Sequence, residues 1–267
     1  MKIKEIKQTI NEIEALSSVT QAYGEIALIK LGKIRKNTQA ARLFFNEISQ
    51  VYSLVKKMVP SPTPVEQNFR LKLILTSNSH FYGHIDKAIM DFFLSQYDPK
   101  KDQVLVVGRT GQELLKSYQV SAIKTMITQD YPTVEEARMI VNQMKNYSQV
   151  LVYFAQFKTV LNQIPVVYDI TQESISKNDK KQEALFIFEP EAIKILEFFD
   201  YQIKMILLEQ TFLVADLART SSRLISMDQA EQNAEQTLGI QKKLLLSAKR
   251  AWENTQLLEG LQYRRTF

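Results

Sequence analysis

The last third of the chain is the feature that most constrains its fold. From Pro190 to about Leu261 there is no further proline, and Gly239 and Gly260 are the only glycines. The stretch therefore predicts one continuous helix, on the order of 100 Å long at 1.5 Å per residue. Helices of that length are coiled coils, membrane spans or shafts. Charged side chains recur too often here for a membrane span, so this helix needs a partner helix.

The amino terminus supplies that partner. Apolar and small residues recur there at alternating spacings of three and four, which is typical of a heptad seam. The carboxy-terminal helix carries a stripe of its own. The amino-terminal seam comprises Ile3, Ile6, Ile10, Ile13, Ser17, Thr20, Gly24, Ala27, Leu31 and Ile34, and the carboxy-terminal stripe comprises Met227, Ala230, Ala234, Leu238, Leu245, Ala248 and Trp252.

Small residues suggest how the two helices pair. Gly24 and Ala27 leave room for a close approach, so we expect an antiparallel coiled coil in which they lie near Ala230 and Ala234. The alternative is an ordinary bundle of amphipathic helices. A bundle predicts shorter segments with frequent caps, which this sequence does not show.

Composition excludes several kinds of chemistry. The chain has 267 residues, 45% of them hydrophobic, and a mild net charge of +5 that permits an acidic partner without demanding nucleic acid. It has no cysteine, which excludes disulfides, thiol catalysis and zinc–thiolate sites. The opening MKIKEIKQT lacks the apolar segment of a signal peptide, so we expect the protein to stay on the side of the membrane where it is made.

The middle of the chain changes period. Residues 59–68 hold three prolines and predict a linker. After it, short apolar runs typical of buried strands alternate with helix-like stretches, and Thr133 stands three residues before Glu136, as in a capping box. The predicted strands are 71–77, 103–108, 149–154, 165–170 and 184–188, and the predicted helices are 85–97, 111–119 and 133–146.

The predicted fold class is therefore α/β. A long antiparallel coiled coil of the terminal helices is joined to a small Rossmann-like α/β domain. The predicted parts are residues 1–58, 69–189 and 190–267.

Two features could carry chemistry. The turn Gly108–Gly111 follows a strand and could direct backbone N–H groups at a phosphate, but a tight strand-to-helix turn needs the same glycines. His80 and His84, with Asp86 nearby, could begin a zinc site, but no third ligand is evident. The common nucleotide loops and the GxSxG elbow are absent, so we expect no catalytic residue, no bound cofactor and no metal site.

Motifs along the chain resemble the gamma subunit of F-type ATP synthases. KIKEIKQTI with Thr20-Gln21-Ala22 and Lys30-Leu31 is similar to that family's opening. Leu75-Thr76-Ser77 before Gly83 resembles its glycine-rich turn. The further matches are Val107–Gly111, Tyr153–Thr159, Phe188-Glu189-Pro190 and, most closely, RLISMDQAEQNA at residues 223–234.

The resemblance implies a rotor. In that family the terminal helices form a shaft inside a hexamer of α and β subunits, and the α/β domain forms a foot on the membrane c-ring with the epsilon subunit. A single copy couples proton flow to ATP synthesis or hydrolysis, at the cytoplasmic face of the cell membrane. The nucleotide sites belong to the α and β subunits, and the chain itself neither spans the membrane nor binds nucleic acid.

The resemblance also indicates residues that contact partners. The basic residues after the small part of the seam match the region that faces acidic β-subunit loops, although a solvated helix face would look the same. The expected partner-contact residues are Lys30, Lys33, Arg35, Lys36, Arg223, Met227, Asp228, Asn233, Lys249 and Arg250.

The chain departs from the family in places. Histidines replace glycines at 80 and 84, Arg219 replaces an expected Glu, and Arg264-Arg265 give the tip a basic end instead of an apolar one. These departures are consistent with a divergent F-type or F-like ATPase. Two other classes of protein are alternatives. A static coiled-coil adaptor would explain the helices but not the ordered motifs, and a nucleic-acid binder would show aromatic residues interleaved with basic ones.

Overall fold

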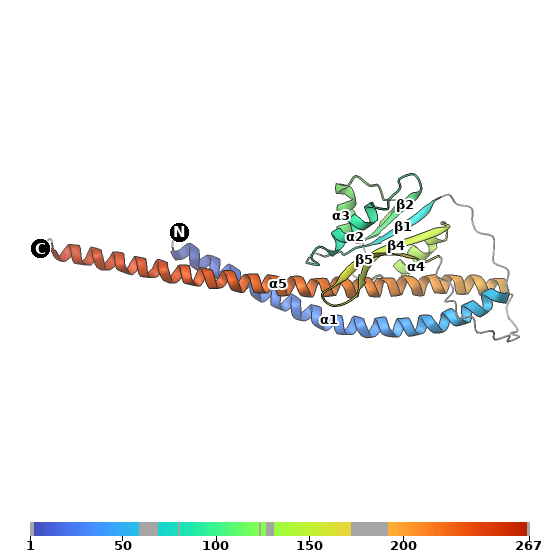
Figure 1. The fold of residues 1–267 in the computed structure, drawn as a ribbon, viewed down its shortest axis with the longest axis horizontal. Coiled ribbons are helices and arrows are strands. Elements are labelled where there is room, and N and C mark those ends of the chain that lie inside the picture. Colours follow the sequence, from blue (N-terminus) through green and yellow to red (C-terminus); the bar gives the residue numbers. More distant parts are fainter. Residues whose placement is uncertain are drawn as a thin grey trace. The chain divides into compact units, whose positions relative to one another are not determined.

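The computed structural model describes residues 3–58, 69–79, 81–122, 124–126, 131–171 and 192–265 (Figure 1). It divides into two compact units. Unit 1 comprises Met1–Leu28 and Leu224–Phe267, and unit 2 comprises Ile29–Arg223. The elements in chain order are α1 (Ile3–Met58), β1 (Arg70–Leu75), α2 (Ile85–Leu94), β2 (Asp102–Val107), α3 (Arg109–Ser117), β3 (Lys124–Met126), α4 (Val134–Met144), β4 (Gln149–Phe157), β5 (Gln163–Asp169) and α5 (Ala192–Arg265).

The two long helices confirm the predicted fold class. α1 has 56 residues and α5 has 74, which corresponds to about 110 Å for α5 at 1.5 Å per residue. Neither helix contains a proline, so no backbone hydrogen bond is lost along it. Pro190, the linker 59–68 and the predicted strand 184–188 lie outside the described residues. The division at 58, 69 and 189 stays a prediction.

Unit 2 is built on a mixed five-stranded sheet of order β3-β2-β1-β4-β5. The first four strands pair in parallel, and β5 pairs antiparallel with β4. The parallel order places a topological switch between β1 and β4, as in Rossmann folds. The predicted strands at 71–77, 103–108, 149–154 and 165–170 are confirmed within two or three residues of their ends. β3 was missed, because its three residues are too short a run to give a pattern.

Helices cover both faces of this sheet. Alternate strand residues point to opposite faces, so Leu73 joins one core and Ile74 the other. One core lies under α4 and α5, and the other under α2 and α3. The predicted capping box begins α4: Thr133 accepts from the Glu136 N–H, and the Glu136 side chain accepts from the Thr133 N–H.

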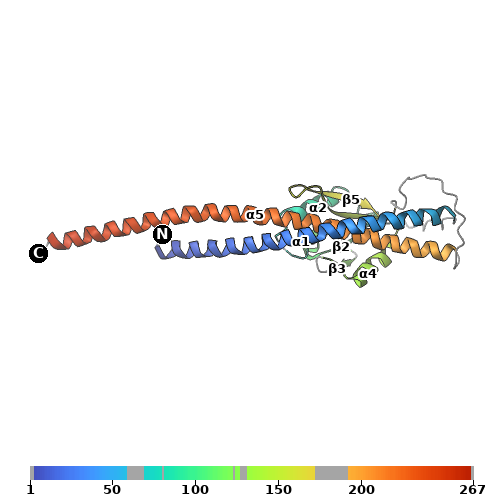
Figure 2. The ribbon, with the colours of Figure 1, turned by 90° about the horizontal axis from the view of Figure 1, so that it is seen from below.

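Within unit 2, α5 is buried nearly all round between Thr211 and Ser222. A helix of that kind is covered on several sides. Leu207 and Phe212 pack against the sheet core, and Phe45 and Ile48 of α1 pack against the same cluster. Figure 2 shows α1 and α5 crossing one another where they pass the sheet domain.

Candidate functional site

In unit 1, α1 and α5 pair through one face each. Along the unit 1 part of α1, the seam positions are buried or half-buried, and Ile6 and Ala27 are almost fully buried. These positions are Ile3, Ile6, Ile10, Ile13, Ser17, Thr20, Gly24 and Ala27, and Thr9 beside them is also half-buried. On the α5 side Met227 and Ala234 are buried, and Ala230 and Leu238 are half-buried. The half-buried positions continue at Gln241, Leu245 and Ala248.

The pairing in unit 1 is antiparallel. A Cβ built on Gly24 would lie 3.9 Å from the Cβ of Met227. Further along, the ammonium of Lys242 lies 3.1 Å from the Glu14 carboxylate, both at the exposed rim. Gly24 therefore faces Met227, about one helical turn before the expected Ala230.

None of the described residues packs over the carboxy-terminal end of α5. Every residue from 251 to 261 is exposed, and Trp252, predicted as part of the stripe, is 55% exposed. The antiparallel register explains this: partners of α5 residues near 251 would lie at the very start of α1. Nothing is described of the side chains of Arg264 and Arg265.

The basic residues on α1 in unit 2 have different surroundings. The ammonium of Lys30 lies 2.9 Å from the carboxylate of Asp216, which is buried on α5. Lys33, Arg35 and Lys36 are exposed. The structure thus assigns Lys30 to an internal ion pair between the two helices, while the other three cations face solvent.

The expected partner-contact residues on α5 also fall into two groups. Asp228, Asn233, Lys249 and Arg250 are exposed. Met227 is buried in the helix seam. Its position supports packing between α1 and α5 in unit 1, and its contact with a partner stays a prediction.

Arg223 belongs to a clamp on the loop after β1. Its guanidinium carbon lies 3.9 Å from the ring centroid of Tyr82, and Nη2 donates to the Ser79 hydroxyl at 3.0 Å. One residue earlier, the Ser222 hydroxyl donates to the Tyr82 carbonyl at 2.7 Å. This loop also holds Phe81 at φ 72°, a conformation that costs a non-glycine residue energy.

The carboxyl end of β1 is filled by α5. Arg219, the residue expected to be Glu, is almost fully buried, and its Nη1 donates to the Thr76 carbonyl at 3.0 Å. Ala218 joins the core on the α2 side of the sheet. In Rossmann folds a ligand binds in the crevice at the switch point, but in unit 2 side chains of α5 lie against that end of β1.

The turn Gly108–Gly111 has a structural explanation. Its amides donate within the protein: Arg109 to the Asn78 side chain at 2.9 Å, Thr110 to the Ser77 carbonyl at 3.1 Å, and Gly111 to the Thr76 hydroxyl at 2.9 Å. A Cβ at Gly111 would meet that hydroxyl at 2.4 Å, and Gly108 has φ 105°. The glycines serve tight packing against Thr76, and the amides are not available to a phosphate.

Asp86, which stands near the two histidines of the candidate zinc site, is bonded to Ser77 instead. Asp86 is buried, and its carboxylate accepts from the Ser77 amide at 3.3 Å and from the Ser77 hydroxyl. His84 is exposed at the start of α2, and His80 lies outside the described residues. Within the described part of the chain, no three His, Cys, Asp or Glu side chains gather as metal ligands.

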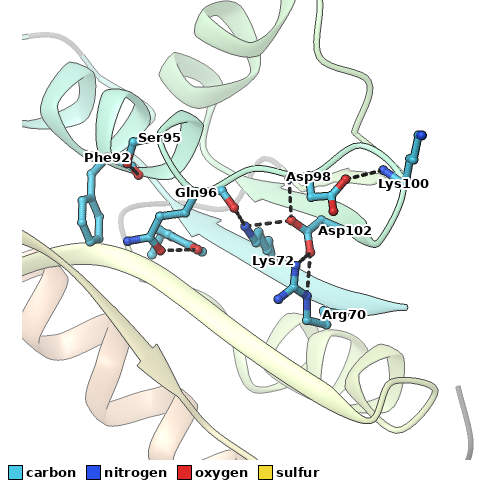
Figure 3. A network of polar contacts seen from close by, with 9 residues as sticks. Arg70, Lys72, Phe92, Ser95, Gln96, Asp98, Lys100 and Asp102 are labelled. Carbon is cyan, nitrogen blue, oxygen red and sulfur yellow. Dashed lines mark hydrogen bonds and ion pairs between the residues drawn. The ribbon is translucent and has the colours of Figure 1, made fainter. Parts of the chain in front are cut away.

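A buried charge network lies at the opposite end of the sheet (Figure 3). The Asp102 carboxylate sits between two cations, 2.8 Å from the Lys72 ammonium and 2.8 Å from the Arg70 guanidinium. Lys72 also donates to the Gln96 carbonyl beyond α2. Burial raises the pKa of Asp102, but hydrogen bonds from Lys72 and the Asp98 N–H, with the positive charges, outweigh burial and hold that pKa below its ordinary 3.8.

The sequence reasoning did not identify this network. Lys72 stands in the run LKLIL, where a lysine between leucines reads as a solvent-facing strand residue. Strand alternation does signal that Lys72 and Ile74 share a face, which α2 covers. The ion pair itself depends on β1 and β2 being neighbours, which no local pattern reveals.

Comparison with known proteins decides the family. A family model described as ATP synthase matches residues 2–251. The ATP synthase gamma chain of Clostridium novyi (strain NT) is 23% identical over 251 residues, covering 87% of each chain. That of Clostridium botulinum (strain Kyoto / Type A2) is 24% identical over 247 residues, covering 87% of this chain and 86% of the relative. The chain belongs to the gamma-chain family of ATP synthase.

Solved structures share the fold of this gamma-family chain. A rotor chain of the Euglena gracilis mitochondrial ATP synthase aligns with a TM-score of 0.69 at 10% identity, over 94% of this chain and 98% of that one. A chain of the Tetrahymena thermophila mitochondrial ATP synthase central stalk and c-ring aligns with a TM-score of 0.58 at 17% identity. The alignment covers 79% of this chain and 99% of that one. The family match does not favour the static-adaptor alternative. No described helix is apolar enough over a sufficient length to cross a bilayer.

Proposed function

We propose that this chain is the central rotor subunit of an F-type ATP synthase. Residues 1–58 and 190–267 form the shaft within a hexamer of α and β subunits, and residues 69–189 form the foot. The foot contacts the membrane c-ring and the epsilon subunit, at the cytoplasmic face of the membrane. The chain couples ion flow through the ring to ATP synthesis or hydrolysis by turning.

The observation that carries the proposal is the family match over residues 2–251, which spans both long helices and the sheet domain. A shaft must resist bending and twisting along its length. Two helices packed antiparallel through a heptad seam supply that stiffness better than a single helix, because each bend must displace packed side chains.

We further propose that nucleotide chemistry belongs to the partner subunits. Two observations support this. The amides at Arg109, Thr110 and Gly111 are bonded within the protein. The carboxyl end of β1, where a Rossmann fold binds its ligand, is occupied by Arg219 of α5.

The exposed cations of α1 are the proposed contact for torque. Lys33, Arg35 and Lys36 can meet acidic loops of successive β subunits. An exposed ion pair contributes only about 0–1 kcal/mol, so contacts of this kind are readily broken and remade as the shaft turns. Lys30 is excluded from this set because its ammonium holds Asp216.

Isolation of the native complex tests the proposal. A tag on this chain should recover ATP synthase α and β subunits in equal amounts, each in excess over the tagged chain, together with the epsilon subunit and the c-ring. Quantitative mass spectrometry of the purified complex measures these ratios. Recovery of the chain with other partners, without α and β subunits, would contradict the rotor proposal and support the static coiled-coil adaptor.

A further inference from the structure

We draw no further inference here: the strongest candidate, the exposed apolar stripe of Leu16, Val19, Tyr23 and Ile26 along the unit 1 part of α1, carries none because nothing among the described residues shows what covers it.

Discussion

The ammonium of Lys72 lies 2.8 Å from the carboxylate of Asp102, and both side chains are almost completely buried. Arg70 compensates the same carboxylate from its other side, while Lys72 lies 5.5 Å from the ring centroid of Tyr153. The Asp102 carboxylate therefore has two charged partners in this network, whereas Lys72 and Arg70 each have one, which is Asp102.

Removing either partner of the buried pair should destabilise unit 2 unequally. Lys72→Met should lower the free energy of unfolding by roughly 3 kcal/mol, because Arg70 still compensates Asp102. Asp102→Asn should cost more, up to about 5 kcal/mol, because it leaves a buried lysine without a counter-charge. Urea denaturation measures both. Equal costs, or a double variant Lys72→Met/Asp102→Leu no more stable than Asp102→Asn, would contradict this account.

The same pair should make stability depend on pH. The folded-state pKa of Asp102 is lower than its unfolded value of 3.8, so its contribution is present above about pH 4 and is lost as pH falls through the folded pKa. The unfolding free energy of the wild type should therefore fall as pH drops below 4. In Asp102→Asn that part of the slope should be missing. Denaturant titrations between pH 7 and pH 3 compare the two slopes.

The helix register in unit 1 can be trapped covalently. A Cβ added at Gly24 would lie 3.9 Å from the Cβ of Met227, within the roughly 3.5–4.5 Å of disulfides. The chain has no cysteine, so Gly24→Cys with Met227→Cys should form one disulfide under mild oxidation, seen by mobility on a non-reducing gel. Gly24→Cys with Ile240→Cys, at an exposed position more than three turns further, serves as the control and should not close. The opposite pattern would refute the register.

Replacing Gly111 or Gly239 by alanine should change the free energy of unfolding in opposite directions. At Gly111 a new Cβ would meet the Thr76 hydroxyl at 2.4 Å and a Val106 methyl at 2.7 Å, so Gly111→Ala should destabilise by a few kcal/mol. At Gly239 nothing lies within 4 Å of a new Cβ on an exposed helix position, so Gly239→Ala should stabilise by about 0.5–1 kcal/mol. Chemical unfolding followed by circular dichroism measures each. A neutral Gly111→Ala would show that the turn can relax.

Neutralising the exposed cations of α1 tests the proposed torque contact. Replacing Lys33, Arg35 and Lys36 together by Gln should leave the complex assembled but make ATP hydrolysis poorly coupled to ion pumping. The matched control replaces Lys87, Lys116 and Arg138, three exposed cations on the helices of the sheet domain, and should couple normally. Pumping per ATP hydrolysed is the measurement. Normal coupling in the first variant at low and moderate salt would contradict the torque contact and indicate that these cations only solvate the helix face.

Much of this protein follows from its sequence because the deciding patterns are local. The seam from Ile3 to Ile34 repeats every three or four residues, and a helix converts that spacing directly into one buried face. The absence of proline predicts the length of α5 in the same way. Short β-branched runs mark β1, β2, β4 and β5, because a buried strand needs only its own few residues to be apolar.

Tertiary structure decided what depends on which distant segments meet. The order β3-β2-β1-β4-β5 places Lys72 beside Asp102, so a lysine in an apolar strand becomes a buried ion-pair partner. Gly24 faces Met227 in unit 1, and Lys30 pairs with Asp216 in unit 2. Such pairings join segments that are distant in the chain, about thirty residues apart for Lys72 and Asp102 and 186 for Lys30 and Asp216. The periodicity of one segment carries no information about its partner's register.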